Sequence, residues 1–377
     1  MAGIYIHIPF CKSRCIYCGF YSTTLLDRRD RYVESLCREM ELRSKVWSRR
    51  SFSTVYLGGG TPSQLTLSQL EKLFRHILYI YKVEENAEVT IECNPDDITE
   101  EFAEGLSSLP VNRVSMGVQT FSDSRLRFLH RRHNSSQAII AVDRLREAGI
   151  DNISIDLMFG FPDETLAEWE ADLDMALSLR VEHLSAYSLM YEEETPLYNM
   201  VKRRQKTDLE KEEELSVQMY DMLIGKLEAA GYEHYEISNF AKSDPCRCFR
   251  SRHNGSYWQG IPYLGLGAAA HSYDIDTRQW NIADIQQYMD AIGKGDVPAE
   301  KEILTDETRY NDTIVTALRT REGISYNHLL DKYKSYLLQQ AKKHITEGTL
   351  AINDGRIALT KKGLFVSDSI MSDLIKV

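Results

Sequence analysis

Three cysteines lie close together near the start of the chain, at Cys11, Cys15 and Cys18. In a reducing compartment, thiols clustered at such C-x3-C-x2-C spacing are typical of metal ligands rather than disulfides. A structural zinc ion needs four protein ligands, and His7 is the one nearby candidate for the fourth. Three thiolates on a [4Fe–4S] cluster would instead leave one iron open, and an α-amino acid could supply it with an amine and a carboxylate. The spacing favours the cluster over zinc or three unrelated thiols.

Six short apolar runs alternate with amphipathic segments along the first half of the chain. Each run is bounded by Gly, Pro or Asn, as is typical of strands buried on both faces. The predicted strands cover 4–8, 53–59, 88–93, 113–118, 152–160 and 183–190. The predicted helices between them cover 28–48, 66–81, 99–108, 135–148 and 164–179. Alternation of this kind predicts an α/β fold with a parallel sheet and right-handed crossovers.

Polar residues occur at or just beyond the carboxyl ends of these runs. The cysteine loop follows the first run and Gly58–Thr61 follows the second, while Glu92 and Gln119 close the third and fourth and Asp156 lies within the fifth. Each could have an ordinary role, such as a tight turn or a capping acid. In a barrel, however, these ends form one rim where functional groups gather. We therefore predict a partial (βα)6 barrel rather than an open sheet.

The pattern changes after residue 200, and we predict three regions: a barrel over 1–200, a covering region over 201–298 and a smaller domain over 299–377. The covering region begins with a long helix over 208–230. For the last region we predict a winged-helix-like α+β domain. It would contain helices near 305–319, 325–333 and 335–347, a hairpin over 350–360 with an Asp-Gly turn, and a closing helix.

Composition excludes several classes of protein. The chain has 377 residues and a formal net charge of −11, whereas a nucleic-acid or anionic-membrane binder needs a basic face. No apolar run approaches the roughly 18 residues that span a bilayer, and the first ten residues do not resemble a secretory signal. We therefore expect a cytoplasmic protein that is not integral to a membrane and has no nucleic-acid partner.

Further motifs extend the pattern beyond the cysteine loop. The stretches "YLGGGTPS", "IECNPDD", "RVSMGVQTF", "LHRRH" and "ISIDLMFGFPDET" follow in order. With the cysteine loop, they resemble the coproporphyrinogen-dehydrogenase-like group of the radical S-adenosylmethionine (SAM) superfamily, closely over 4–273 and more loosely beyond. The resemblance implies a [4Fe–4S] cluster on Cys11, Cys15 and Cys18, which in that family cleaves SAM into methionine and a 5′-deoxyadenosyl radical.

The resemblance also assigns contacts to SAM, residue by residue. The aromatic residues Tyr5 and Tyr17 would touch SAM, and the glycine motif Gly59, Gly60 and Thr61 would meet its methionine part. Glu92 would lie near its amino group. The carboxylate and the ribose would be received by Gln119, Arg131 and Asp156. Two alternatives stay open: Arg132 could replace its neighbour Arg131, and Tyr5 could serve packing alone.

Two kinds of protein in this group share these motifs. The oxygen-independent coproporphyrinogen III dehydrogenase usually has a further cysteine two positions after the third cluster cysteine and a long amino-terminal extension. Here Phe20 takes that position and the first strand begins by Ile4. Both departures favour the HemW-type haem chaperones, with the dehydrogenase as the alternative and a radical SAM enzyme for another substrate as the third possibility.

The HemW-type proteins carry an H-N-x-x-Y-W motif, which here runs from His253 to Trp258. The resemblance implies that His253 binds haem, since imidazole can ligate haem iron and aromatic rings suit a flat macrocycle. Nearby arginines at 250 and 252 could pair with the propionates. Alternatively, Cys246 or Cys248 could be the ligand, or the motif could be an ordinary folded loop. The implied partners are haem or porphyrin and the membrane or cytosolic haem proteins that accept it.

Overall fold

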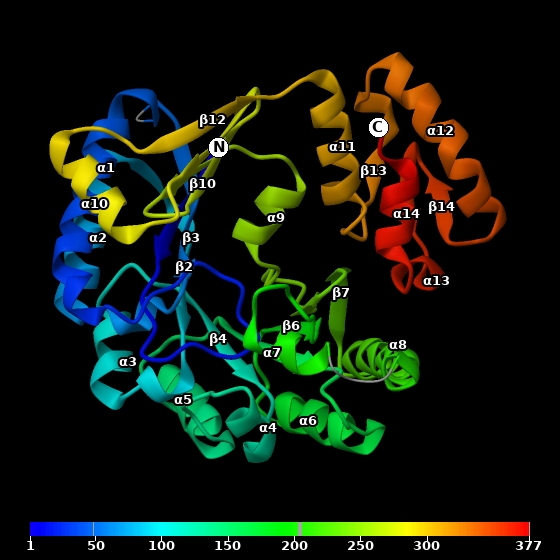
Figure 1. Cartoon of the computed structure of the whole chain (residues 1–377), viewed down its shortest axis with the longest axis horizontal. Coiled ribbons are helices and arrows are strands. Elements are labelled where there is room, and N and C mark those ends of the chain that lie inside the picture. Colours follow the sequence, from blue (N-terminus) through cyan, green and yellow to red (C-terminus); the bar gives the residue numbers. More distant parts are fainter. Residues whose placement is uncertain (48, 203–205, 377) are drawn as a thin grey trace.

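The computed structural model describes residues 1–47, 49–202 and 206–376, with the backbone alone over 206–210. Its centre is a curved sheet whose six parallel strands follow one another in chain order (Figure 1). These strands are β1 (Ala2–Ile8), β2 (Ser51–Gly59), β3 (Lys82–Cys93), β4 (Arg113–Gln119), β5 (Ile153–Phe159) and β6 (His183–Ser188). The predicted α/β class and the predicted parallel strands are confirmed.

Helices cover the outer face of this sheet and connect its strands. They are α1 (Arg29–Trp47), α2 (Leu67–Ile80), α3 (Glu100–Ser107), α4 (Asp123–Phe128), α5 (Ser135–Glu147) and α6 (Leu166–Ser178). Reciprocal capping boxes start three of them, at Thr66, Asn134 and Thr165, and satisfy amide groups that the first helical turn leaves free. Only the short helix α4 was not expected from the sequence.

The strands differ from the prediction in one respect. They are buried on both faces, but the inner face is polar rather than apolar. On β4, for example, Arg113, Ser115 and Gln119 line the interior, whereas the alternating residues Val114 and Met116 belong to the apolar core under the helices. The barrel therefore encloses a polar space, and its hydrophobic core lies between sheet and helices.

Further strands extend the sheet at both ends, which the sequence did not predict. Beside β1 lies β9 (Tyr263–Leu266), which is parallel to it, followed by antiparallel β10 (His271–Asp274), β11 (Thr277–Asn281) and β12 (Ala299–Ile303). Beyond β6 lie the antiparallel strands β8 (Asn239–Lys242) and β7 (Tyr232–Glu236). In the described residues the end strands β7 and β12 do not pair with each other, so the barrel is partial.

Four helices accompany these added strands: α7 (Pro196–Val201), α8 (Lys206–Ala229), α9 (Arg252–Trp258) and α10 (Ile285–Lys294). Helix α8 corresponds to the predicted helix over 208–230. Helix α9 carries the H-N-x-x-Y-W motif and lies against β1 and β2 on the concave side of the sheet (Figure 1). None of the helices in the described part of the chain is long and apolar enough to cross a membrane.

The last part of the chain packs around a second apolar core, which includes Tyr310, Ile314 and Leu337. It contains α11 (Asp306–Ala317), β13 (Ile324–Ser325), α12 (Asp331–Thr346), β14 (Leu350–Asn353), β15 (Arg356–Leu359), α13 (Lys361–Leu364) and α14 (Ser367–Leu374). The Asp-Gly hairpin turn is present, with positive φ at Asp354 and Gly355. The smaller α+β unit is thus confirmed, while the domain boundaries at 200 and 298 stay predictions.

The predicted helix over 325–333 is wrong. Ile324 and Ser325 instead form β13 and pair with Ile357 and Arg356 of β15, so their backbone groups are used by a sheet. A single 3-10 turn, Tyr326–His328, follows. Helix α12 consequently begins at Asp331 rather than at 335.

Candidate functional site

A cavity of about 610 Å³ opens at the carboxyl ends of the parallel strands and reaches into the barrel. Its size is that of a small-molecule site. All but two of the predicted site residues line it: Cys11, Cys15, Tyr17, Cys18, Gly59, Gly60, Thr61, Glu92, Gln119, Arg131 and Asp156. The structure therefore gathers residues from six strands and loops in one place, although the role of each stays a prediction.

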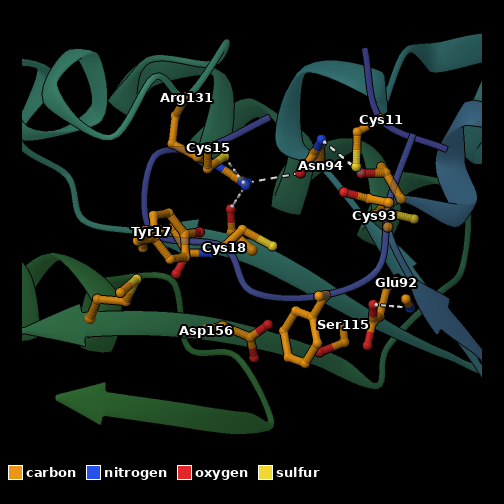
Figure 2. Close-up of a pocket in the computed structure, with 18 of the residues that line it drawn as sticks. Cys11, Cys15, Tyr17, Cys18, Glu92, Cys93, Asn94, Ser115, Arg131 and Asp156 are labelled. Atoms are coloured by element: carbon orange, nitrogen blue, oxygen red, sulfur yellow. Dashed lines mark hydrogen bonds between the residues drawn. The ribbon is translucent and has the colours of Figure 1, made fainter. Parts of the chain in front are cut away.

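The three thiols of the cysteine loop surround the mouth of this cavity (Figure 2). They are half-buried and free of disulfides. The Sγ atom of Cys11 lies 3.5 Å from Thr61 Oγ1, and that of Cys15 accepts a hydrogen bond of 3.7 Å from Arg131 Nη1. Burial raises the pKa of the Cys11 and Cys18 thiols, so a positive centre would be needed to keep them as thiolates.

The donor set does not fit a zinc ion. No three His, Cys, Asp or Glu side chains in the described residues are close enough together to hold one metal ion. The ring nitrogens of His7 are already occupied, by Tyr5 Oη at 3.0 Å and by the Tyr21 carbonyl at 2.9 Å. Thiols spaced around a cavity mouth fit a larger centre with one cysteine for each of several irons.

The glycine motif forms one wall of the cavity at the end of β2. Gly59 has a φ of +111°, which side chains other than glycine rarely adopt. A Cβ atom on Gly60 would lie 2.7 Å from the carbonyl carbon of Pro9, so only glycine lets β2 end this close to β1. The exposed backbone here can approach a ligand closely, as the predicted contact to the methionine part of SAM requires.

Two half-buried carboxylates, Glu92 and Asp156, face the cavity without an ion pair in the described residues. Burial raises the pKa of Glu92 to about 7 and that of Asp156 to about 6. Tyr56 Oη donates to Glu92 Oε1 at 2.7 Å, and the amide of Gly59 donates to Glu92 Oε2 at 3.2 Å. Carboxylates held in this way are suited to a cationic ligand, and SAM carries both a sulfonium and an ammonium group.

Arg131, rather than Arg132, is directed at the cysteine loop. Its Nη2 atom donates to Asn94 Oδ1 at 2.8 Å and to the Gly117 carbonyl at 2.5 Å, while its buried Nε atom has no partner (Figure 2). Arg132 instead pairs with Asp96 at 2.9 Å and Asp97 at 3.1 Å. Arg131 is thus the arginine with a free donor beside the thiols.

Gln119 also lines the cavity, and its backbone is unusual. It lies at an irregularity in the pairing of β4 with β5 and has a φ of +70°. Strained backbone of this kind is concentrated at functional sites. The bulge directs the predicted carboxylate contact to the cavity rim.

Tyr5 does not line the cavity in this arrangement, and its contact with SAM stays a prediction. Its hydroxyl is bonded to His7, and its ring stacks on Tyr56 and His253 at centroid distances of 6.3 Å and 6.4 Å. The packing alternative describes it better.

His253 is not placed as a haem ligand. It is 1% exposed, and both ring nitrogens are engaged, Nδ1 with Thr54 Oγ1 and Nε2 with Tyr257 Oη, each at 2.8 Å. Burial lowers its pKa to about 3. Haem iron could reach it only if these contacts broke, so in this arrangement His253 serves as a structural residue of the barrel interior, and its role as a haem ligand stays a prediction.

The arginines and cysteines near this motif are also outside the cavity. Arg250 pairs with Glu233 at 2.5 Å and Glu322 at 2.8 Å, and Arg252 donates to the carbonyl of Asn86 at 2.7 Å. Cys246 and Cys248 are exposed and do not line the cavity.

Comparisons with known proteins agree with this architecture. Residues 5–176 match the radical SAM superfamily, and residues 304–366 match the HemN C-terminal domain. The heme chaperone HemW of Bacillus subtilis is 35% identical, covering 98% of each chain. The heme chaperone HemW of Lactococcus lactis is 33% identical, covering 98% of this chain and 96% of its own. The chain belongs to the HemW family of radical SAM proteins.

A solved structure shows the shared fold. The coproporphyrinogen III oxidase HemN of Escherichia coli, described as a radical SAM enzyme, superposes with a TM-score of 0.85. The match covers 100% of this chain and 90% of that one, at 22% sequence identity. Membership of the radical SAM superfamily implies a [4Fe–4S] cluster and SAM as cofactors, and the thiols, glycine wall and buried acids fit both.

Sequence reasoning missed several cavity residues of this HemW-family chain. Tyr56 positions Glu92, and Asn254, the neighbour of His253, lines the cavity. The exposed side chains of Phe20, Tyr187 and Met190 surround its mouth. For Tyr56 a signal was present: it alternates with apolar Val55 and Leu57 on β2, as an inward-facing residue must.

Proposed function

We propose that this protein is a haem chaperone that binds haem and delivers it to acceptor haem proteins in the membrane or the cytosol. Full-length similarity to curated heme chaperones carries the proposal. Phe20 supports it, because it occupies the position where the coproporphyrinogen dehydrogenase group usually has a further cysteine.

In this proposal the chain also holds a [4Fe–4S] cluster and SAM. Cys11, Cys15 and Cys18 would bind the cluster, which when bound and reduced supplies the electron for SAM cleavage. The wall at Gly59 and Gly60 would receive the methionine part of SAM. Five further residues would complete the site: Thr61 at the wall, Glu92 at the ammonium group, Asp156 at the ribose, and Gln119 and Arg131 at the carboxylate.

We propose that haem binds at the mouth of the cavity rather than at His253. Three large side chains are exposed there: Phe20 by 71%, Met190 by 67% and Tyr187 by 42%. Together they leave apolar surface uncovered beside a polar cavity. Arg14 lines the same mouth and has no ion pair within the described residues. An apolar rim beside an arginine without an ion pair suits a macrocycle that carries propionates. A methionine thioether can ligate haem iron.

A haem titration tests the function and this binding site together. We expect a Soret band when haem is added to the full-length protein, and a roughly tenfold weaker affinity in Met190→Ala. Met200→Ala is the matched control, because Met200 is 53% exposed but lies outside the cavity lining. The absence of any haem-induced spectral change would overturn the chaperone proposal. An equal loss of haem affinity in both variants would rule out the binding site at the mouth.

The fold shared with HemN makes porphyrin decarboxylation the second candidate. Reconstituted protein incubated anaerobically with coproporphyrinogen III, SAM and a reductant tests it. We expect no vinyl product. Conversion of propionates to vinyl groups would make the protein a coproporphyrinogen dehydrogenase.

A further inference from the structure

The inner end of the cavity contains a buried arginine that forms no hydrogen bond or ion pair with the described residues. Arg113 is the first residue of β4, is 2% exposed and lines the cavity. Within the described residues its guanidinium nitrogens make no hydrogen bond and no ion pair, and Nε is fully buried. A buried charge without a partner is costly, so its presence calls for a group that completes it.

The side chains around Arg113 are polar but uncharged. Ser115 and Ser154 face each other on the paired strands β4 and β5, and His183 of β6 pairs with Ser154. Both ring nitrogens of His183 are hydrogen-bonded, Nδ1 with Ser154 Oγ and Nε2 with Tyr235 Oη, each at 2.7 Å. Burial keeps its pKa well below the usual value, so it is neutral and adds no second cation.

The nearest acids are either committed elsewhere or too far away to pair. Glu88 accepts the backbone amides of Arg252 and His253 at 3.0 Å and 2.9 Å, where it caps helix α9. Asp156 lies opposite Gly117 in the register of β4 and β5 and forms no ion pair with Arg113 in the described residues, although the charge of Arg113 lowers the pKa of Asp156 against the larger effect of burial. No carboxylate of the described chain therefore forms an ion pair or a hydrogen bond with the guanidinium.

A second free group points into the same space. Asn254 lines the cavity from helix α9, and its side-chain amide has no hydrogen bond to any described residue. Its neighbour His253 is fixed on both sides, so the helix presents Asn254 from a rigid base. A guanidinium and a carboxamide, neither hydrogen-bonded to a described residue, thus offer several donors on the wall of one cavity.

We propose that the floor of the barrel cavity is a binding site for a carboxylate group, in which Arg113 forms the ion pair and Asn254 donates a further hydrogen bond. The planar guanidinium can bind both carboxylate oxygens at once, which a buried site strengthens. The carboxylate belongs to a ligand that enters through the mouth. Two sources share this chemistry: the amino-acid end of a SAM-like ligand that lies deeper in the cavity than one whose carboxylate is at Gln119 and Arg131, and a propionate of haem.

Matched probes separate the two sources. Binding to full-length protein is measured for S-adenosylhomocysteine and for its analogue without the carboxylate, S-adenosylthiopropylamine. It is also measured for iron mesoporphyrin and for its dimethyl ester, in which both carboxylates are blocked. The variants are Arg113→Gln, Arg113→Lys and the surface control Arg75→Gln.

We expect Arg113→Gln to weaken at least one carboxylate-bearing probe by roughly 10- to 100-fold, the range of a charged hydrogen-bonded contact. The affinity for the corresponding probe without a free carboxylate should be the same in Arg113→Gln as in the wild-type protein. Arg113→Lys should retain part of the affinity and Arg75→Gln all of it. Unchanged affinity for both carboxylate probes, or equal loss with and without the carboxylate, would overturn the site.

Thermal unfolding of the ligand-free protein gives an independent check. Removal of an unpaired buried charge should leave Tm of Arg113→Gln unchanged or higher. A lower Tm with unaltered affinities would show a purely structural arginine and overturn the proposal. Only the propionate arm rests on the proposed function: if wild-type protein binds no porphyrin, that function fails, while the S-adenosylhomocysteine arm still decides the site.

Discussion

The cysteine loop and helix α9 each bring a short motif to the barrel cavity, but the structure uses their donor atoms differently. In the loop, three half-buried thiols face open space and make few contacts. In α9, His253 is buried and hydrogen-bonded at both nitrogens, and its ring stacks on Tyr56 at a centroid distance of 4.9 Å. The comparison shows that a ligand is distinguished from a structural residue by whether its coordinating atoms are free.

The same contrast explains the chemistry of the two regions. A thiol whose pKa is raised by burial has much to gain from a metal centre, because the thiolate is then stabilised. An imidazole that already bonds Thr54 and Tyr257 would have to lose both contacts to bind iron. Each of the following changes would break or sharpen this contrast.

The largest effect is expected from Cys15→Ala. Loss of one of three thiolates should abolish the visible cluster absorbance and remove nearly all iron and sulfide, while circular dichroism stays that of a folded barrel. Cys246→Ala is the control, since that thiol is exposed and distant from the cavity lining. A full complement of iron and sulfide in Cys15→Ala would contradict the ligand assignment.

His253→Ala should act on stability rather than on haem. It removes two buried hydrogen bonds and leaves a cavity beside Tyr56, so we expect a loss of roughly 2–4 kcal/mol in the free energy of unfolding. Denaturant titration measures this, with the exposed His328→Ala as a near-neutral control. If stability hardly changed while the Soret band disappeared, His253 would be the haem ligand after all.

The smallest effect concerns pH and the ligand-facing acids. Glu92 has a pKa of about 7 in the folded protein, above its ordinary value of 4.5, so the folded state holds this proton more tightly. Ligand-free stability should therefore fall as pH rises from about 4.5 to about 7, and Glu92→Gln should reduce this slope, with the remainder due to other raised carboxyl groups such as Asp156.

Affinity for cationic SAM should change in the opposite sense. It should rise a few-fold between pH 6 and pH 8, as the carboxyl group ionises. Equilibrium dialysis at several pH values measures this, with Glu92→Gln as the comparison. A wild-type affinity that does not vary with pH would show that the charge of Glu92 is not used.

Much of the fold could be predicted because its strands carry strong local signals. Runs such as Ile153–Phe159 are rich in apolar and β-branched residues, and Gly and Asn mark their ends. Strands β7 to β12 escaped prediction because most have only four or five residues and pair antiparallel, with no apolar run to mark them. The segment at 325 looked helical, but its pairing with β15 depends on residues some thirty positions later.

The cavity could be predicted in part. The cysteine spacing identified its mouth. Its polar interior was not predicted, because the strand sequences look uniformly apolar unless alternate residues are considered separately. Arg113, Ser115, Gly117 and Gln119 alternate with Val114, Met116 and Val118, and this period of two was the available signal. The contact of His253 with Thr54 could not be predicted, because Thr54 is nearly two hundred residues away.

The position of β1 has a consequence for synthesis of the protein. This first strand lies between β2 and β9, so one edge of it stays open until residues 263–266 have left the ribosome. Until then the nascent chain exposes an unpaired, apolar edge next to the cysteine loop, and such edges are prone to wrong pairing. Closure of the sheet at this edge must therefore wait for a segment some 260 residues further along the chain than β1.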